Sequence, residues 1–179
     1  VGWRGEHLEL VLGAETLNWS SAEVFNPTDG INSRNLDSDL ERPEKMAEPI
    51  VRTRVRFGEG GLDLLYLPAR IEPRFPGAAS RLNWAGSALR QAYWGDQNGH
   101  VSRKRFAHQF AIRADQTFGS TDFTLHYVSH ADRAMPGIAV NQMNGEAVPI
   151  YSHTQRMGGS VVSQVGDWLV KFEGEYHQP

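Results

Sequence analysis

The stretch DWLVKFEGEY, residues 167–176, sorts its side chains by parity. One parity is apolar at Trp168, Val170, Phe172 and Tyr176. The other parity is charged at Asp167, Lys171, Glu173 and Glu175. This alternation predicts a β-strand, because successive side chains of a strand point to opposite faces. In an aqueous domain the apolar face covers a core, whereas in a membrane barrel it meets lipid and the charged face lines the lumen.

The same period recurs along most of the chain. Together with 168–177, the stretches at about 7–18, 50–57, 62–68, 105–118, 121–130 and 153–165 give seven candidate strands. Tight glycine-containing turns fall at 58–61, 119–120 and 166–167, and long loops fall at about 20–49, 69–104 and 131–152. A short helix is expected only at 87–94. The alternation of tight turns with long irregular loops is typical of outer-membrane barrels and rare in aqueous domains.

Hairpin registers provide a second test of this pattern. Pairing Phe57 with Leu62 across the first turn places the apolar side chains on one face. Across the second and third turns, pairing Ala114 with Leu125 and Val165 with Trp168 does the same. We therefore predict one all-β domain over residues 1–179, an antiparallel up-and-down transmembrane β-barrel. Seven strands is an odd number and bacterial barrels have even numbers, so we expect part of a larger barrel.

The parity assigns side chains to the two faces of that barrel. The predicted lumen-lining residues are Arg52, Arg54, Arg56, Asp63, Arg113, Asp115, His126, Lys171, Glu173 and Glu175. The predicted lipid-facing residues are Val55, Phe57, Leu64, Tyr66, Phe110, Ile112, Leu125, Tyr127, Trp168, Val170, Phe172 and Tyr176. Three aromatic residues beside the tight turns, Phe57, Phe118 and Trp168, match the aromatic girdle of such barrels. Leu65, Leu67 and Val162 are apolar exceptions on the polar parity. A sandwich in water with a hydrated outer face is the alternative.

The chain also resembles a known family in three stretches. These are LNWSSAEVFNPTDGINSRN at 17–35, DSDLERPEKMAEPIVRTRV at 37–55 and GGLDLLYLPARIEPRFP at 60–76. They are similar to bacterial outer-membrane porin-like barrels of the alginate-export type, with matching residues at Trp19, Asn26, Pro27, Asp29 and Pro68. The resemblance implies a channel in the bacterial outer membrane and says little about its substrate.

Composition and motifs narrow the chemistry. The chain has no cysteine, a formal charge of -3 and a mean hydropathy of -0.47, so disulfides, thiolate sites and nucleic-acid partners are not expected. No nucleophile, zinc-protease or phosphate-loop motif is present, and we expect neither an enzyme nor a cofactor. His126 and His130 are roughly 13 Å apart on a strand, too far to share a metal. Asp37, Asp39 and Glu41 are weak calcium candidates in a loop whose default role is a solvated acidic segment.

The expected function is passive diffusion of small hydrophilic, anionic or carbohydrate solutes through a channel, with the lipid bilayer and the solute as partners. Arg52, Arg54 and Arg56 form a row on one strand that would attract anions along the wall. The loop at 69–104 is a candidate constriction, or a segment that packs its own aromatic residues. Two alternatives stay open: a soluble antiparallel β-domain that binds carbohydrate, and a gated outer-membrane transporter.

Overall fold

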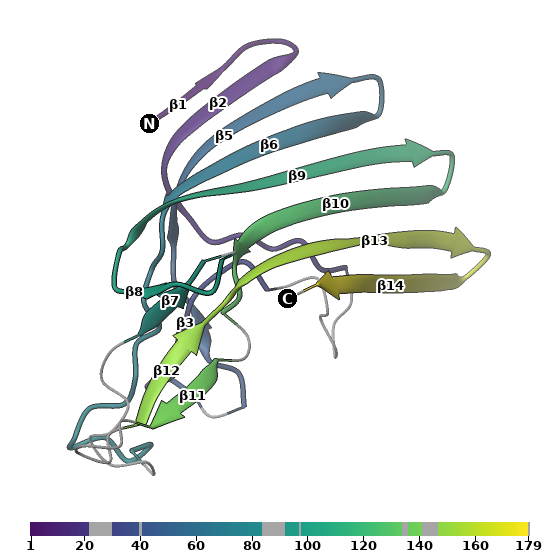
Figure 1. Ribbon diagram of the computed structural model, residues 1–179. Helices are drawn as coiled ribbons and strands as arrows, with labels where there is room; N and C mark the ends of the chain where they lie inside the picture. The colour runs from purple at the N-terminus through teal and green to yellow at the C-terminus, as the bar shows by residue number, and fades with distance from the viewer. Residues whose placement is uncertain are drawn as a thin grey trace.

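The computed structural model describes residues 1–21, 30–39, 41–83, 92–96, 98–133, 136–140 and 147–178, which form fourteen strands and no helix. In those ranges no helix is long and apolar enough to cross a membrane. The predicted all-β antiparallel class is confirmed. Eight strands form one antiparallel sheet in the order β1-β2-β5-β6-β9-β10-β13-β14 (Figure 1). Their bounds are Gly2–Arg4, Leu8–Glu15, Glu48–Phe57, Gly60–Ala69, Phe106–Phe118, Thr121–Ala131, His153–Val165 and Trp168–Gln178.

The tight turns lie together at one end of this sheet (Figure 1). Each contains a glycine with positive φ, at 53° for Gly58, 60° for Gly119 and 62° for Gly166, a conformation that other residues rarely adopt. The second and third hairpins have the predicted registers, including Ala114 opposite Leu125 and Val165 opposite Trp168. The register predicted for the first hairpin is wrong by two residues, because Val55 rather than Phe57 lies opposite Leu62. A shift of two preserves the faces.

The strand count differs from the prediction by one. The additional strand is β1, which pairs with β2 through Gly2–Arg4. It lies in the opening stretch VGWRGE, whose sequence indicates the end of a strand followed by a tight turn. The main sheet therefore has eight strands rather than seven. Among the described residues β1 and β14 do not pair with each other, so the sheet is open and forms no closed barrel.

The long connections are less irregular than predicted. A four-stranded sheet lies at the end of the molecule opposite the tight turns (Figure 1) and consists of β11 (Gly137–Val140), β12 (Ala147–Tyr151), β7 (Tyr93–Gly95) and β8 (Val101–Ser102). We call it the cap sheet. Strands β3 (Arg34–Asn35) and β4 (Glu44–Lys45) form a further pair. The expected helix at 87–94 falls mostly outside the described residues, and its last two residues belong to β7.

Register places the side chains of the main sheet on two chemically distinct faces. Cross-strand partners share a face, and one row of partners runs through Arg4, Glu9, Arg54, Asp63, Arg113, His126, Gly158 and Glu175. We call this side the polar face. The next row, on what we call the apolar face, runs through Trp3, Leu10, Thr53, Leu64, Ile112, Tyr127, Met157 and Tyr176. The sorting by parity thus extends across all eight strands.

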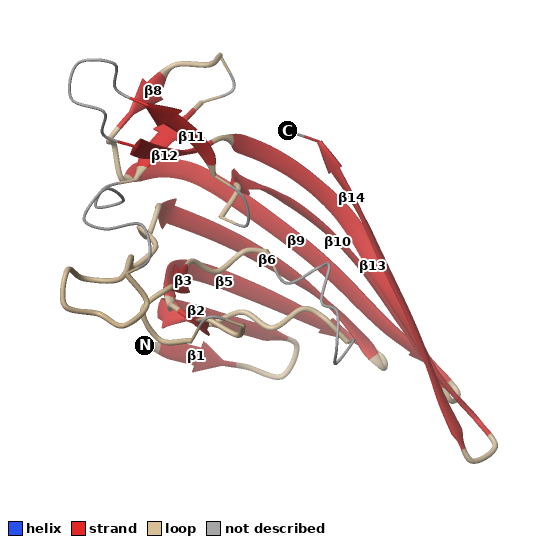
Figure 2. Ribbon diagram, turned by 90° about the horizontal axis from the view of Figure 1, so that it is seen from below, coloured by secondary structure: helices blue, strands red, loops and turns tan. Residues whose placement is uncertain are grey.

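The sheet is curved (Figures 1 and 2), and a contact across its polar face shows that this face is the concave one. The Ser21 N–H donates to the carboxylate of Glu173 on β14. Ser21 follows Glu15, the last residue of β2, by only six residues. In a flat sheet the six strand spacings between β2 and β14 would measure roughly 29 Å. Six extended residues reach at most about 20 Å. The chain after β2 can reach β14 only because the main sheet, which we also call the wall, bends around it.

This bridging chain covers an apolar cluster on the polar face. We define the crossing segment as residues 16–21 and 30–33. Its Leu17, Trp19 and Ile31 are buried against residues of the sheet, namely Ile50, Leu65, Leu67, Ala111 and Val128. The apolar exceptions Leu65 and Leu67 are therefore covered by protein. A second cluster, Ala92, Trp94, Ala131 and Tyr151 with Phe75 against it, forms the core beneath the cap sheet.

Candidate functional site

The arginine row of β5 lies on the polar face as predicted, but its charges are paired. Arg52 Nη1 donates to Glu15 Oε1 at 2.9 Å, and Arg52 Nε lies 3.2 Å from Asp63 Oδ1. Arg54 donates to both carboxylate oxygens of Asp115 at 2.9 Å. Strands β2, β6 and β9 thus supply acids to its first two arginines. The arginine row therefore does not present a series of unpaired positive charges.

The pairing continues at the remaining arginine of the row. Arg56 Nη2 donates to Glu9 Oε2 at 2.5 Å, and Arg54 Nη1 donates to Asp63 Oδ2 at 2.5 Å. Side chains of Glu9 and Asp63 are only 10% and 8% exposed, so these pairs are shielded from bulk water. Shielded bidentate and charge-assisted contacts are stronger than surface ion pairs. The polar face at this level therefore carries acidic and basic side chains that are paired with one another.

Arg113 differs from the arginines of β5. Among the described residues no carboxylate oxygen lies within 4.0 Å of its guanidinium, whose carbon lies 6.0 Å from the centre of the Trp19 ring. His126, its cross-strand partner, lies with its ring centre 5.7 Å from that of Trp19, and its Nε2 is 3.3 Å from Glu175 Oε2. Trp19 therefore sits over the middle of the wall, above β9 and β10.

The crossing segment is anchored at several points. Leu17 N–H donates to Asn32 Oδ1 at 2.9 Å, and Lys45 Nζ donates to the Leu17 carbonyl at 3.0 Å. Gly30 is placed directly against Arg156, where a Cβ atom would overlap the guanidinium. A larger residue at this position would displace the Arg156 guanidinium. The segment lies in a defined path across the polar face.

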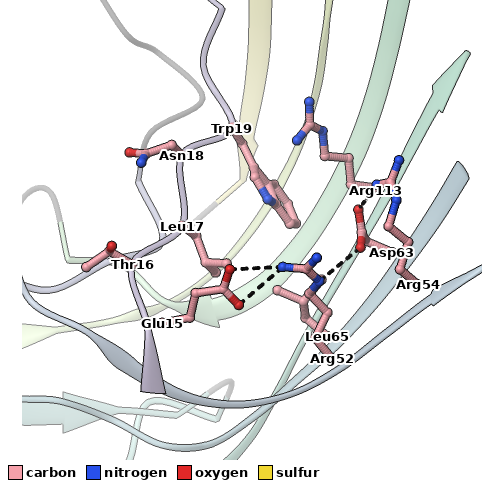
Figure 3. A pocket seen from close by; sticks show the side chains of 10 residues that line it. All are labelled: Glu15, Thr16, Leu17, Asn18, Trp19, Arg52, Arg54, Asp63, Leu65 and Arg113. Carbon is pink, nitrogen blue, oxygen red and sulfur yellow. Dashed lines mark hydrogen bonds and ion pairs between the residues drawn. The ribbon is translucent and has the colours of Figure 1, made fainter. Parts of the chain in front are cut away.

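A cavity of about 160 Å³ lies between the crossing segment and the wall (Figure 3). Its lining residues are Glu15, Thr16, Leu17, Asn18, Trp19, Arg52, Arg54, Asp63, Leu65 and Arg113. Figure 3 shows Arg52 between Glu15 and Asp63, with Trp19 and Arg113 on the far side of the space. The cavity is a few water molecules in size, and charged groups of both signs line it.

A buried ion pair joins the base of β5 to the chain after β10. Arg133 Nε lies 3.2 Å from Glu48 Oε1, and the two side chains are 1% and 0% exposed. Arg133 also approaches His130 Nδ1 at 3.0 Å and donates to the Ala131 carbonyl at 3.1 Å. Glu48 accepts the Ser33 N–H at 2.8 Å. The crossing segment, the sheet and the chain leading to the cap sheet meet at this pair.

The predicted face residues divide as expected. All ten predicted lumen-lining residues lie on the polar face, and all twelve predicted lipid-facing residues lie on the apolar face. Sequence reasoning missed Glu9 and Glu15, two of the four acids that pair with the arginine row. Their parity within 7–18 was visible, but the register of β2 against β5 was not, since a long loop separates the two strands. The covering role of Leu17 was missed for the same reason.

Other predicted residues have structural roles where they are described. Asp39 Oδ1 accepts the N–H groups of Arg42 and Glu41 at 2.8 Å each, and these bonds lower the pKa of its carboxyl. Asp37 accepts the Ser80 hydroxyl. No group of three or more metal-ligating side chains occurs in the described ranges. The calcium candidates are therefore not assembled around a common point there.

The family-like residues and the candidate constriction loop are only partly described. Trp19 is buried and Pro68 lies in β6, whereas Asn26, Pro27 and Asp29 fall outside the described residues. Within 69–104, Trp94 is fully buried with its ring centre 5.4 Å from that of Tyr151. In its described part this loop contributes Trp94 and Phe75 to the cluster in the cap that also contains Tyr151 of β12. The crossing segment of the first long loop lies on the polar face.

Comparisons with known proteins add no relative to this picture. No protein-family model, curated protein or solved structure matches the chain.

Proposed function

We propose that this chain forms the wall of an outer-membrane channel, with lipid against its apolar face and small hydrophilic solutes diffusing along its polar face. The observation that carries the proposal is the burial of the two faces. Leu125, Phe172 and Trp168 on the apolar face are 70%, 73% and 77% exposed. Several charged residues on the polar face are buried, among them Glu9, Asp63 and Arg156. An aqueous sheet has the opposite arrangement, with its apolar face covered.

The dimensions of the apolar face fit a bilayer. The first and last residues of β9, Phe106 and Phe118, are both exposed and have the same parity, and they are twelve residues and so roughly 40 Å apart along the strand. At a strand tilt of about 45° this length spans roughly 28 Å of bilayer. The apolar band of outer-membrane barrels is about 25 Å tall. Aromatic residues gather at its tight-turn end, where Phe118 and Phe123 pack edge to face at 5.9 Å. Phe118 is one of the three aromatic residues for which the sequence predicts a girdle at this end.

Membrane insertion imposes one further requirement. Unpaired N–H and C=O groups at a sheet edge cost several kcal/mol each in lipid. The proposal therefore requires β1 and β14, the two edges of the open sheet, each to pair with a further strand in the membrane. A barrel completed in this way would enclose the concave polar face.

The polar face favours hydrophilic solutes without a strong preference for charge. Arg52, Arg54 and Arg56 are each compensated by a nearby carboxylate, so no dominant field of one sign runs along the wall. Transport along such a surface needs only diffusion, with the crossing segment narrowing the passage. The family resemblance in residues 17–76 supports the same class of protein.

Membrane partition and conductance test the proposal directly. We expect the protein to fractionate with membranes, to require detergent for extraction, and to produce stepwise conductance in planar bilayers. The control is the same preparation after heat unfolding, which should give no steps. Recovery of the folded protein from the aqueous fraction without detergent would refute the proposal.

Replacing Arg54 with glutamine should shift ion selectivity toward cations. The change frees Asp115 and part of Asp63 from their compensating charge, so the wall becomes more negative. The reversal potential in a salt gradient measures the shift. Arg103→Gln, which removes the same charge over Tyr93 in the cap sheet, should leave selectivity near that of the unmodified protein. Equal reversal potentials for both variants would remove Arg54 from the conduction path.

A further inference from the structure

Glu173, on β14, attaches the crossing segment to the polar face of the sheet. One of its oxygens, Oε2, accepts the Ser21 N–H at 2.8 Å, the Ser20 hydroxyl at 3.0 Å and the Ser21 hydroxyl at 3.1 Å. The donors and the acceptor are more than 150 residues apart in sequence. Three hydrogen bonds to one carboxylate oxygen form a strong local attachment.

The attached residues belong to no strand. Residues 16–21 follow β2 and make no ladder with the main sheet, so side-chain contacts determine their position. Trp19, next to the attached serines, packs on His126 and Arg113 over the middle of the wall. Beneath this stretch lie Leu65 and Ala111, which are 3% and 4% exposed. The attachment at Glu173 therefore holds Trp19 across the concave face and keeps those wall residues covered.

We propose that Glu173 is a latch that fixes residues 16–21 across the polar face and thereby sets the free cross-section of the passage. This inference rests on the proposed channel function for its consequence in transport, although the attachment itself does not. Loss of the latch would let residues 19–21 move away from the wall, because this stretch makes no backbone ladder with the sheet. The bonds of Leu17 with Asn32 and Lys45 would still hold the start of the segment. The passage would then widen, and larger solutes would pass.

The absence of cysteine allows the latch to be tested apart from transport. Ala111→Cys introduces a single thiol under the crossing segment with a small change in volume. In detergent-purified protein we expect slow labelling of this thiol by a charged, water-soluble thiol reagent. Adding Glu173→Ala should raise the labelling rate at least about tenfold, given the strength of hydrogen bonds to a charged group. Glu173→Gln, which retains a carbonyl acceptor, should give an intermediate rate.

Asp122→Asn is the matched control for charge. Asp122 is an exposed acid of the same polar face, bonded to Thr117 near the tight turns and away from residues 16–21. Its neutralisation should leave the labelling rate of the introduced thiol unchanged. Equal labelling rates in the Glu173→Ala and parent proteins, both folded by circular dichroism, would overturn the latch.

Conductance provides the second readout. In planar bilayers Glu173→Ala should raise single-channel conductance and the size of neutral polymers that enter the channel, whereas Asp122→Asn should change neither. Faster labelling in a protein that shows no conductance would support the latch and count against the channel. Unchanged labelling and conductance in a conducting protein would support the channel and eliminate the latch.

Discussion

Replacing Leu125 with arginine is expected to lower the free energy of unfolding from lipid bilayers by about 2–4 kcal/mol. Leu125 lies in the row that runs through Val55, Leu62 and Ala114, midway along the apolar face. In a bilayer an arginine there must lose its hydration or drag water into the hydrocarbon. In water the outcome differs, because a side chain that is 70% exposed can be exchanged for a charged one at a cost within about 0.5 kcal/mol.

Val165→Arg provides the matched comparison. Val165 is also an exposed apolar residue of the same face, but it precedes the turn at Gly166 and so lies at the expected membrane interface. There the cost of arginine falls to about 0–1 kcal/mol. Denaturant titrations of both variants in vesicles measure the difference between the two positions. Small and equal effects would place the apolar face in contact with something other than lipid.

The parts of the fold that could be predicted are those that a short local stretch of sequence determines. The second and third hairpins were predicted correctly because each turn offers one glycine, Gly119 or Gly166, for the positive φ. The first turn offers Gly58, Gly60 and Gly61, and only Gly58 adopts positive φ. The two later glycines belong to β6, which explains the error of two residues. The assignment of side chains to the two faces is still correct, because a shift of two residues equals one full side-chain period of a strand.

The site was less predictable because it depends on contacts between distant parts of the chain. The compensation of Arg52 by Glu15 requires the register of two strands that a long loop separates. The path of the crossing segment depends on the curvature of the whole sheet, which no local pattern encodes. Leu65 and Leu67 were the available signal, since apolar residues on a polar parity indicate that something covers them.

The buried pair between Glu48 and Arg133 gives the other large expected effect. Arg133→Met should lower the free energy of unfolding by about 3–5 kcal/mol, because it leaves the fully buried Glu48 carboxylate without its cation. Burial lowers the pKa of the Arg133 guanidinium, and the Glu48 carboxylate opposes that shift. Each charge thus depends on the other for its stability in the interior. The Ser33 N–H that Glu48 accepts ties the crossing segment to the same pair.

A double-mutant cycle separates the ion pair from the packing around it. Glu48→Gln keeps a carbonyl acceptor for Ser33 and removes the charge, so adding it to Arg133→Met should recover a large part of the loss. Arg105→Met is the control, since its pair with Glu72 is at a similar distance, 3.3 Å, but Arg105 is 68% exposed. Exposed pairs contribute at most about 1 kcal/mol. A loss at Arg133 no larger than at Arg105 would mean that the junction of crossing segment, sheet and cap is held by its apolar neighbours. Recovery in the double variant would instead show that the uncompensated charge, and not the missing side chain, opens this junction.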